Sequence, residues 1–138
     1  MARARINSLT MDRTRLGYAH GCFNIVGGLW PILSLRSFEA VFGPKADRWL
    51  EYTVSGLLIT NGLAQLHAAR RAPEVGRTIG AGTAATLLTI DVIFVPNGTI
   101  RWTYLLDGVM ELGWLGLWRR TVAPADQSCL ERGSASRG

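Results

Sequence analysis

The chain lacks the sequence features by which several classes of protein are recognised. It has two cysteines, Cys22 in an apolar stretch and Cys129 near the end of the chain, and these imply no disulfide framework. It contains no phosphate-binding loop, no metal-ligand spacing, no nucleophile elbow and no strong internal repeat. The arginines are not interleaved with aromatic residues, so the net charge of +5 does not indicate nucleic-acid binding. We therefore predict no metal, no cofactor and no nucleic acid among the ligands.

Charge is also scarce, because only 18% of the residues are charged whereas 48% are hydrophobic. The charged residues cluster in short patches that separate four apolar stretches, each near the lower length limit for a helix that crosses a bilayer. These stretches predict an all-α, antiparallel bundle of four transmembrane helices over residues 16–33, 50–68, 78–95 and 102–118. A soluble four-helix bundle is the competing interpretation, since the first and third stretches contain many polar or small residues.

The distribution of positive charge predicts the orientation of this bundle. Basic residues are enriched in cytoplasmic loops of membrane proteins. If both termini are cytoplasmic, four basic residues lie outside: Arg36, Lys45, Arg48 and Arg101. The other eleven then lie inside: Arg3, Arg5, Arg13, Arg15, Arg70, Arg71, Arg77, Arg119, Arg120, Arg132 and Arg137. Tryptophans and tyrosines near the span ends agree with the belts that form at headgroup level.

The segments between the spans carry their own signals. Apolar residues at helical spacing in 34–45 predict a short interfacial helix in the first outer loop, closed by Gly43 and Pro44; an irregular loop is the alternative. Residues 70–77 are predicted to connect the second and third helices, and 96–99 to form a tight turn. Residues 1–15 are predicted to be a short polar arm. The four-helix domain then covers 1–120, followed by a flexible cytoplasmic tail, 121–138.

Three carboxylates fall inside the predicted spans, although a charge at the centre of a membrane helix costs about 3 kcal/mol or more. They are Asp91 in the third span and Asp107 and Glu111 in the fourth. Helical periodicity places them on interior faces and predicts a pocket that opens to the outer side and ends at Glu111. The other predicted pocket residues are Asn24, Asn61, Trp30, Tyr104, Trp114, Glu51 and Arg101.

Three roles are open to these acids. Burial and a neighbouring carboxylate favour the protonated form, so Glu111 can hold a proton and act as an acid. An ionised pair can instead hold a cation or an amine. In a purely structural network, Arg101 or Arg36 would neutralise Asp107 or Asp91. A separate possibility is haem ligation by His20 and His67, which both lie near the cytoplasmic ends of their helices.

The order of features resembles the small four-helix bacterial membrane proteins grouped around DoxX. The resemblance rests on Trp30-Pro31, on Phe42-Gly43-Pro44 and on the helix from Tyr104 through Asp107 to Glu111. The acid-lined interior is also similar in kind to the EXPERA group of sterol isomerases and sigma-2-type receptors, in which a few helices enclose a lipophile beside carboxylates. These resemblances imply a multi-pass protein of the bacterial inner membrane.

The sequence thus favours an intramembrane pocket that binds a small lipophilic molecule or catalyses its isomerisation or cyclisation by acid. Whether the chain is an enzyme stays open. The alternatives are a structural or assembly subunit of a membrane complex and a small transporter coupled to protons or cations. The expected partners are the lipid bilayer, a lipophilic ligand, and a second copy or another membrane subunit.

Overall fold

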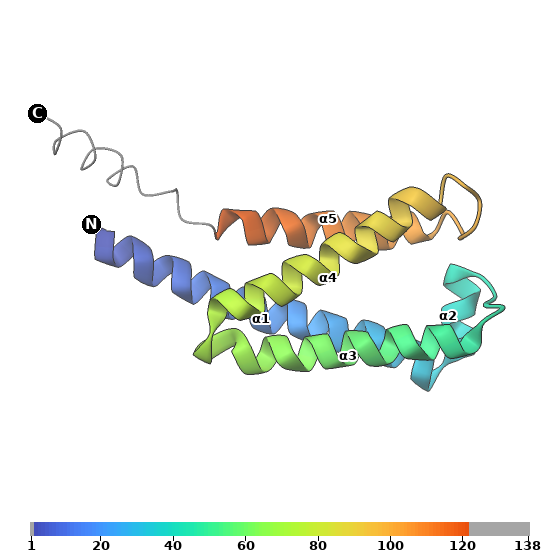
Figure 1. The fold of residues 1–138 in the computed structure, drawn as a ribbon, viewed down its shortest axis with the longest axis horizontal. Helices are drawn as coiled ribbons and strands as arrows, with labels where there is room; N and C mark the ends of the chain where they lie inside the picture. The colour runs from blue at the N-terminus through green and yellow to red at the C-terminus, as the bar shows by residue number, and fades with distance from the viewer. Residues whose placement is uncertain (1, 122–138) are drawn as a thin grey trace, which may run out of the picture.

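The computed structural model describes residues 2–121, with side chains from Asp12 onward, and shows an all-α protein (Figure 1). The described residues form five helices and no strand. These are α1 (Ala2–Leu33), α2 (Leu35–Phe42), α3 (Arg48–Arg71), α4 (Pro73–Phe94) and α5 (Tyr104–Arg120). The predicted all-α class is therefore confirmed. The predicted tail lies outside the described residues except for Thr121, which is buried.

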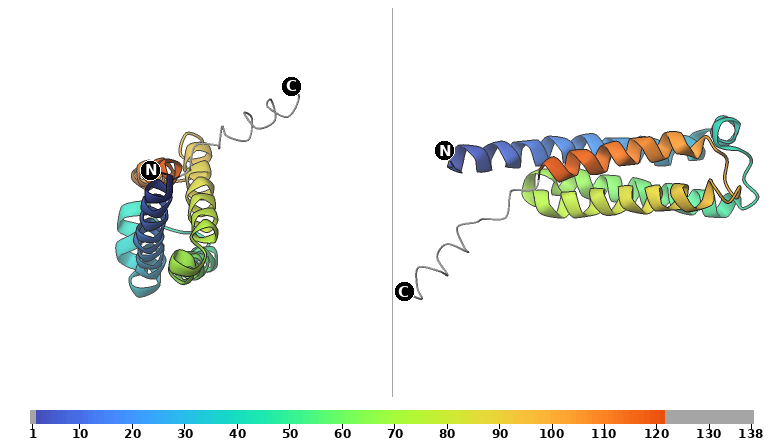
Figure 2. Two further views of the ribbon diagram at one scale, coloured as in Figure 1. Left: turned by 90° about the vertical axis from the view of Figure 1, so that its left-hand side faces the viewer. Right: turned by 90° about the horizontal axis from the view of Figure 1, so that it is seen from above.

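The four long helices run side by side as an antiparallel bundle (Figure 2). The amino terminus, the α3–α4 connection and the end of α5 lie together at what we call the terminal end. The α4–α5 turn and the short α2 lie at the opposite end, the α2 end. The α1–α3 pair has the most extensive contact, whereas α1 and α5 touch at only a few places. The bundle is thus tightest along α1–α3, whereas the backbones of α1 and α5 lie farther apart.

The connections differ in part from those predicted. The short helix expected in 34–45 is confirmed as α2, which is bent 107° from α1 and ends at Gly43, where φ is +88°. The predicted 70–77 connection is wrong, because only Ala72 separates α3 from α4. Pro73 begins α4 at a position that suits its fixed φ and missing N–H. Residues 2–15 of the predicted polar arm form the beginning of α1, which is helical from Ala2.

Small residues let α1 and α3 approach closely. A Cβ added to Gly62 would lie 2.6 Å from the carbonyl oxygen of Gly21, and one added to Gly28 would lie 2.6 Å from that of Ser55. No larger residue fits at either place without moving the backbones apart. Such contacts gain dispersion energy where no hydrophobic force drives helices together.

The interior of the bundle is polar and its surface is apolar. Among the fully buried side chains are those of His20, Asn24, Gln65 and Glu111. Many large apolar side chains are exposed instead, such as Leu33 at 78% and Trp49 at 68%. By length and apolar composition, one described helix, α4, qualifies as a membrane span, and the bent α1–α2 pair counts as at most a second. That test alone does not establish the predicted four spans.

Candidate functional site: acids inside the bundle

The α4–α5 hairpin brings the three predicted acids into the interior of the bundle. Glu111 is completely buried, Asp91 is 2% exposed and Asp107 is half-buried. Asp91 packs against α5 at Gly108, where an added Cβ would lie 3.4 Å from its Oδ2 atom. Asp91 and Asp107 are also close enough to act electrostatically on Glu111. The structure therefore brings the three carboxyl groups together inside the bundle, and their role as a site stays a prediction.

These acids lack the partners that buried carboxyl groups normally have. Neither Glu111 oxygen has a hydrogen-bond partner, and neither has Oδ2 of Asp91. Within residues 12–121, no ion pair involves any of the three acids. Arg101, one of the two arginines proposed to neutralise them, donates to the carbonyl oxygen of Ala40 instead, over 3.3 Å. An internal arginine network thus does not explain why the acids are there.

The same described region contains no cluster of His, Cys, Asp or Glu side chains arranged to hold a metal ion.

A second polar cluster, which we call the histidine cluster, lies nearer the terminal end. Trp118 donates its indole N–H to Nδ1 of His20 over 3.0 Å, and the His20 ring stacks on Trp114 at 4.4 Å. Beside them, Asn24 donates to Gln65 over 2.8 Å. These contacts join α1 to α5 and α1 to α3. His20, Asn24, Gln65 and Trp118 thus each make a hydrogen bond to another helix, although Nε2 of His20 and Nε2 of Gln65 have no partner.

Gly80 of α4 provides the space for this cluster. A Cβ added there would lie 2.8 Å from the indole nitrogen of Trp118 and 2.9 Å from Nδ1 of His20. His67, by contrast, is exposed and contacts Arg71 over 3.2 Å. With one histidine buried against tryptophans and the other at the surface, the structure gives no support to haem ligation by the pair.

Lys45 lies at the α2 end, which is the side to which the predicted pocket opens. Its ammonium group donates to the Tyr104 hydroxyl, lies 4.4 Å from the centre of that ring, and is 4.0 Å from Glu51. Burial lowers the pKa of Lys45, while Glu51 and Glu39 act in the opposite direction. Sequence reasoning missed this residue, because helical periodicity says nothing about where a loop side chain will fold.

The remaining predicted residues fall into separate groups. Asn61 is half-buried and donates to Thr83 over 3.2 Å, so it joins α3 to α4. Trp30 is exposed at the α1–α2 corner, where it donates to Ser37 over 2.8 Å. Arg101, as described above, reaches over to α2. Trp30 and Arg101 are thus not part of the acid group, although the sequence predicted them in one pocket.

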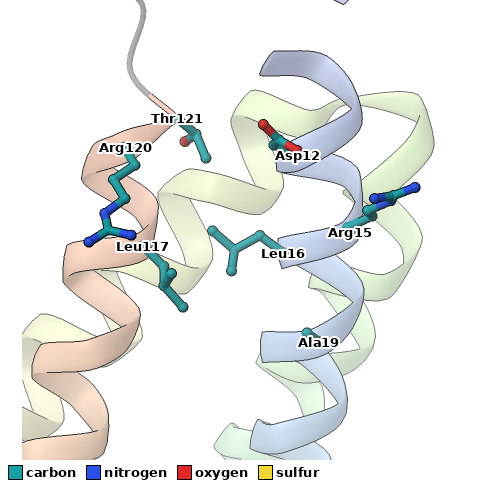
Figure 3. Close-up of a pocket in the computed structure, with 7 residues that line it drawn as sticks. All are labelled: Asp12, Arg15, Leu16, Ala19, Leu117, Arg120 and Thr121. Atoms are coloured by element: carbon teal, nitrogen blue, oxygen red, sulfur yellow. The ribbon is translucent and has the colours of Figure 1, made fainter. Parts of the chain in front are cut away.

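A surface groove of about 370 Å³ lies at the terminal end, between α1 and α5 (Figure 3). The residues that line it are Asp12, Arg15, Leu16, Ala19, Leu117, Arg120 and Thr121. None of the predicted site residues is among them, so this groove is distinct from the acid group.

The chain matches no protein family, no curated protein and no solved structure. The resemblances to the DoxX and EXPERA groups therefore stay predictions, and a function must be argued from the residues themselves.

Proposed function

We propose that the chain is a membrane protein whose four long helices all span the bilayer. The inverted distribution of polarity supports this placement, because exposed leucines and valines surround buried amides and acids. In water this arrangement would leave large apolar surfaces uncovered, whereas in lipid those surfaces face hydrocarbon. Only one helix qualifies by apolar composition alone because the interior polar residues lower the average of the others, and α5 has only 17 residues.

The terminal end would then face the cytoplasm, with both termini inside. Arg70, Arg71, Arg119 and Arg120 gather there at the ends of α3 and α5, as the positive-inside bias requires. We expect this membrane to be the bacterial inner membrane. A fusion of alkaline phosphatase to residue 98 should be active, and one to residue 72 inactive; the reverse pattern would overturn the orientation.

The function that this interior supports best is binding of a small lipophilic molecule at the acids. The observation that carries the proposal is Glu111, which is fully buried and has no partner for either carboxyl oxygen. A carboxyl group left in this state is costly, unless a proton or a ligand satisfies it. Glu111 would donate a hydrogen bond to a carbonyl group or bind an amine. Asp91 and Asp107 would influence whether Glu111 carries a proton. In an enzymatic version it would protonate an alkene or an epoxide.

The α1–α5 seam is the route by which a ligand would reach Glu111. The backbones of these two helices approach each other at only a few places, and α5 carries Glu111. A lipophile dissolved in the bilayer would enter sideways by separating them. Trp114, which lies on α5 between Glu111 and Trp118, would form the apolar wall beside the bound molecule.

The test is mass spectrometry of small molecules that co-purify with the wild-type protein and with two variants. Glu111→Gln keeps the shape of the side chain but removes the acid. Asp47→Asn makes the same chemical change at an exposed position. We expect a lipophile that remains with wild type and Asp47→Asn and is lost from Glu111→Gln. No bound molecule in any of them, with unchanged stability, would favour the assembly subunit instead.

A second candidate function is proton transfer across the bundle. Ionisable side chains are spread along the length of the bundle. They run from His20, nearer the terminal end, through Glu111 and Asp107 to Lys45 at the α2 end. Nε2 of His20 is also buried without a partner, so the terminal half contributes one group that can exchange a proton. Reconstituted liposomes should then show proton flux that Glu111→Gln abolishes. Equal flux in both proteins would rule out this function.

A further inference from the structure

The groove at the terminal end has the composition of a binding site for an amphiphile. Leu16 and Leu117 extend into the space between α1 and α5, with Ala19 deeper on the α1 side (Figure 3). Arg15 and Arg120 also line this space, one from α1 and the other from α5, and Figure 3 shows both guanidinium groups turned outward from it. An apolar groove bordered by two cationic residues is complementary to a molecule with a hydrocarbon chain and an anionic group.

The groove is closed toward the interior of the bundle. The residues that follow Ala19 and Leu117 are His20 and Trp118, which are buried and joined by the 3.0 Å hydrogen bond that links α1 to α5. A molecule in the groove would therefore stop at the histidine cluster and would not reach Glu111. This makes the groove a second site, separate from the one proposed at the acids.

The two arginines differ from a neighbouring arginine that is already engaged. Arg13 pairs with Glu74 and donates to the Thr121 carbonyl oxygen over 2.9 Å, so it ties α1 to α4 and to the end of α5. Arg15 and Arg120 are exposed on the two sides of the groove. Because both side chains are exposed, they can turn toward a ligand in the groove, whereas Arg13 is held by its partners.

We propose that this groove binds a phospholipid of the cytoplasmic leaflet. Arg15 and Arg120 turn inward to hold its phosphate, and an acyl chain lies over Leu16, Ala19 and Leu117. Arginine recognises phosphate by paired, charge-assisted hydrogen bonds. Asp12 at the same rim can accept hydrogen bonds from the hydroxyl or amine groups of the headgroup. The inference rests on the membrane placement in the proposed function, but not on a ligand at Glu111.

The experiment is native mass spectrometry of the detergent-solubilised protein titrated with phosphatidylglycerol. Arg15→Gln/Arg120→Gln removes both groove cations, and Arg71→Gln/Arg119→Gln removes two exposed cations from the same end. At about fivefold for each arginine, the groove variant should bind about 25-fold more weakly. The control should change binding by no more than about twofold. Equal weakening in the two variants would overturn the proposal, because the phosphate would then respond only to the overall charge.

A second variant tests the acyl chain without changing charge. Ala19 is exposed, so Ala19→Trp can fold while filling the groove. It should abolish phosphatidylglycerol binding, and glycerol 3-phosphate should not compete with the lipid for the wild-type protein. Unchanged lipid binding in Ala19→Trp, or effective competition by glycerol 3-phosphate, would show that the arginines bind phosphate alone. A protein that stays soluble and monodisperse without detergent would instead refute the membrane placement and with it the proposed function.

Discussion

The histidine cluster and the acid group occupy the same interior but are built differently. In the histidine cluster, Trp118 donates to His20 and Asn24 donates to Gln65, so most polar groups have a partner from another helix. In the acid group, Glu111 and Asp91 are equally buried, yet three of their four carboxyl oxygens have none. The first arrangement is typical of interhelical hydrogen bonding that holds a bundle together. The second leaves buried carboxyl oxygens without such bonds, and this difference is why the proposed function places a ligand at the acids.

The largest expected effect is that of Gly80→Ala, which would break the histidine cluster. Its new Cβ would lie within 3 Å of the Trp118 and His20 nitrogens, so both side chains must move. We expect a loss of about 3 kcal/mol in the free energy of unfolding, at the upper end for overpacking. Denaturation in mixed detergent and SDS, followed by tryptophan fluorescence, measures it.

Gly82→Ala is the matched control, since a Cβ there meets nothing within 4 Å. It should leave stability unchanged or raise it slightly, because alanine favours the helix over glycine. Equal stability of the two variants would show that the histidine cluster is not a rigid part of the fold.

A smaller loss is expected from Trp118→Phe, which removes one hydrogen bond and keeps an aromatic ring. His20 Nδ1 would be left buried without its donor, at a cost of about 1–3 kcal/mol. The same unfolding measurement applies, with Trp102→Phe as the control at an exposed tryptophan. A loss below about 0.5 kcal/mol in Trp118→Phe would mean that the bond contributes nothing net.

The smallest effect on stability is expected at the acid group. Glu111→Gln replaces a carboxyl that has no partner by an amide of the same shape, so the ligand-free protein should change by less than about 1 kcal/mol. If the wild-type protein carries a ligand, the variant should also lose the stabilisation that the ligand gives. Unfolding before and after delipidation separates the two. A loss above 2 kcal/mol in the delipidated variant would reveal a structural role and remove the contrast between the two groups.

The sequence predicted the interior faces better than the ends of the helices. A period of 3.6 residues put Asp91, Glu111 and Asn24 inside, because a side chain's direction follows from its position along a helix. The predicted 70–77 connection is wrong because basic residues also occur near helix ends. Arg70 and Arg71 lie in the last turn of α3, and Arg77 lies in α4. Basic residues in the last turn of α3 suit the negative end of its dipole, and Pro73 suits the first turn of α4.

Contacts between distant segments could not be predicted in the same way. His20 and Trp118 are 98 residues apart, and nothing in the sequence indicates that they meet. Lys45 folds over Tyr104 from a loop whose path depends on Gly43 and on the bend after Leu33. Pairings of this kind follow from helix rotation and loop geometry, which a single sequence does not specify.

The order of the helices along the chain has a consequence for biosynthesis. The close α1–α3 pair can form before α5 has been synthesised, since its glycine contacts involve no later residue. Asp91, however, packs against Gly108, and Glu111 itself lies on α5. A nascent chain can therefore form its α1–α3 pair before it has all three acids, and Asp91 is made before Gly108, against which it packs. A ribosome that stops before residue 104 would release a chain that has Asp91 but neither Asp107 nor Glu111.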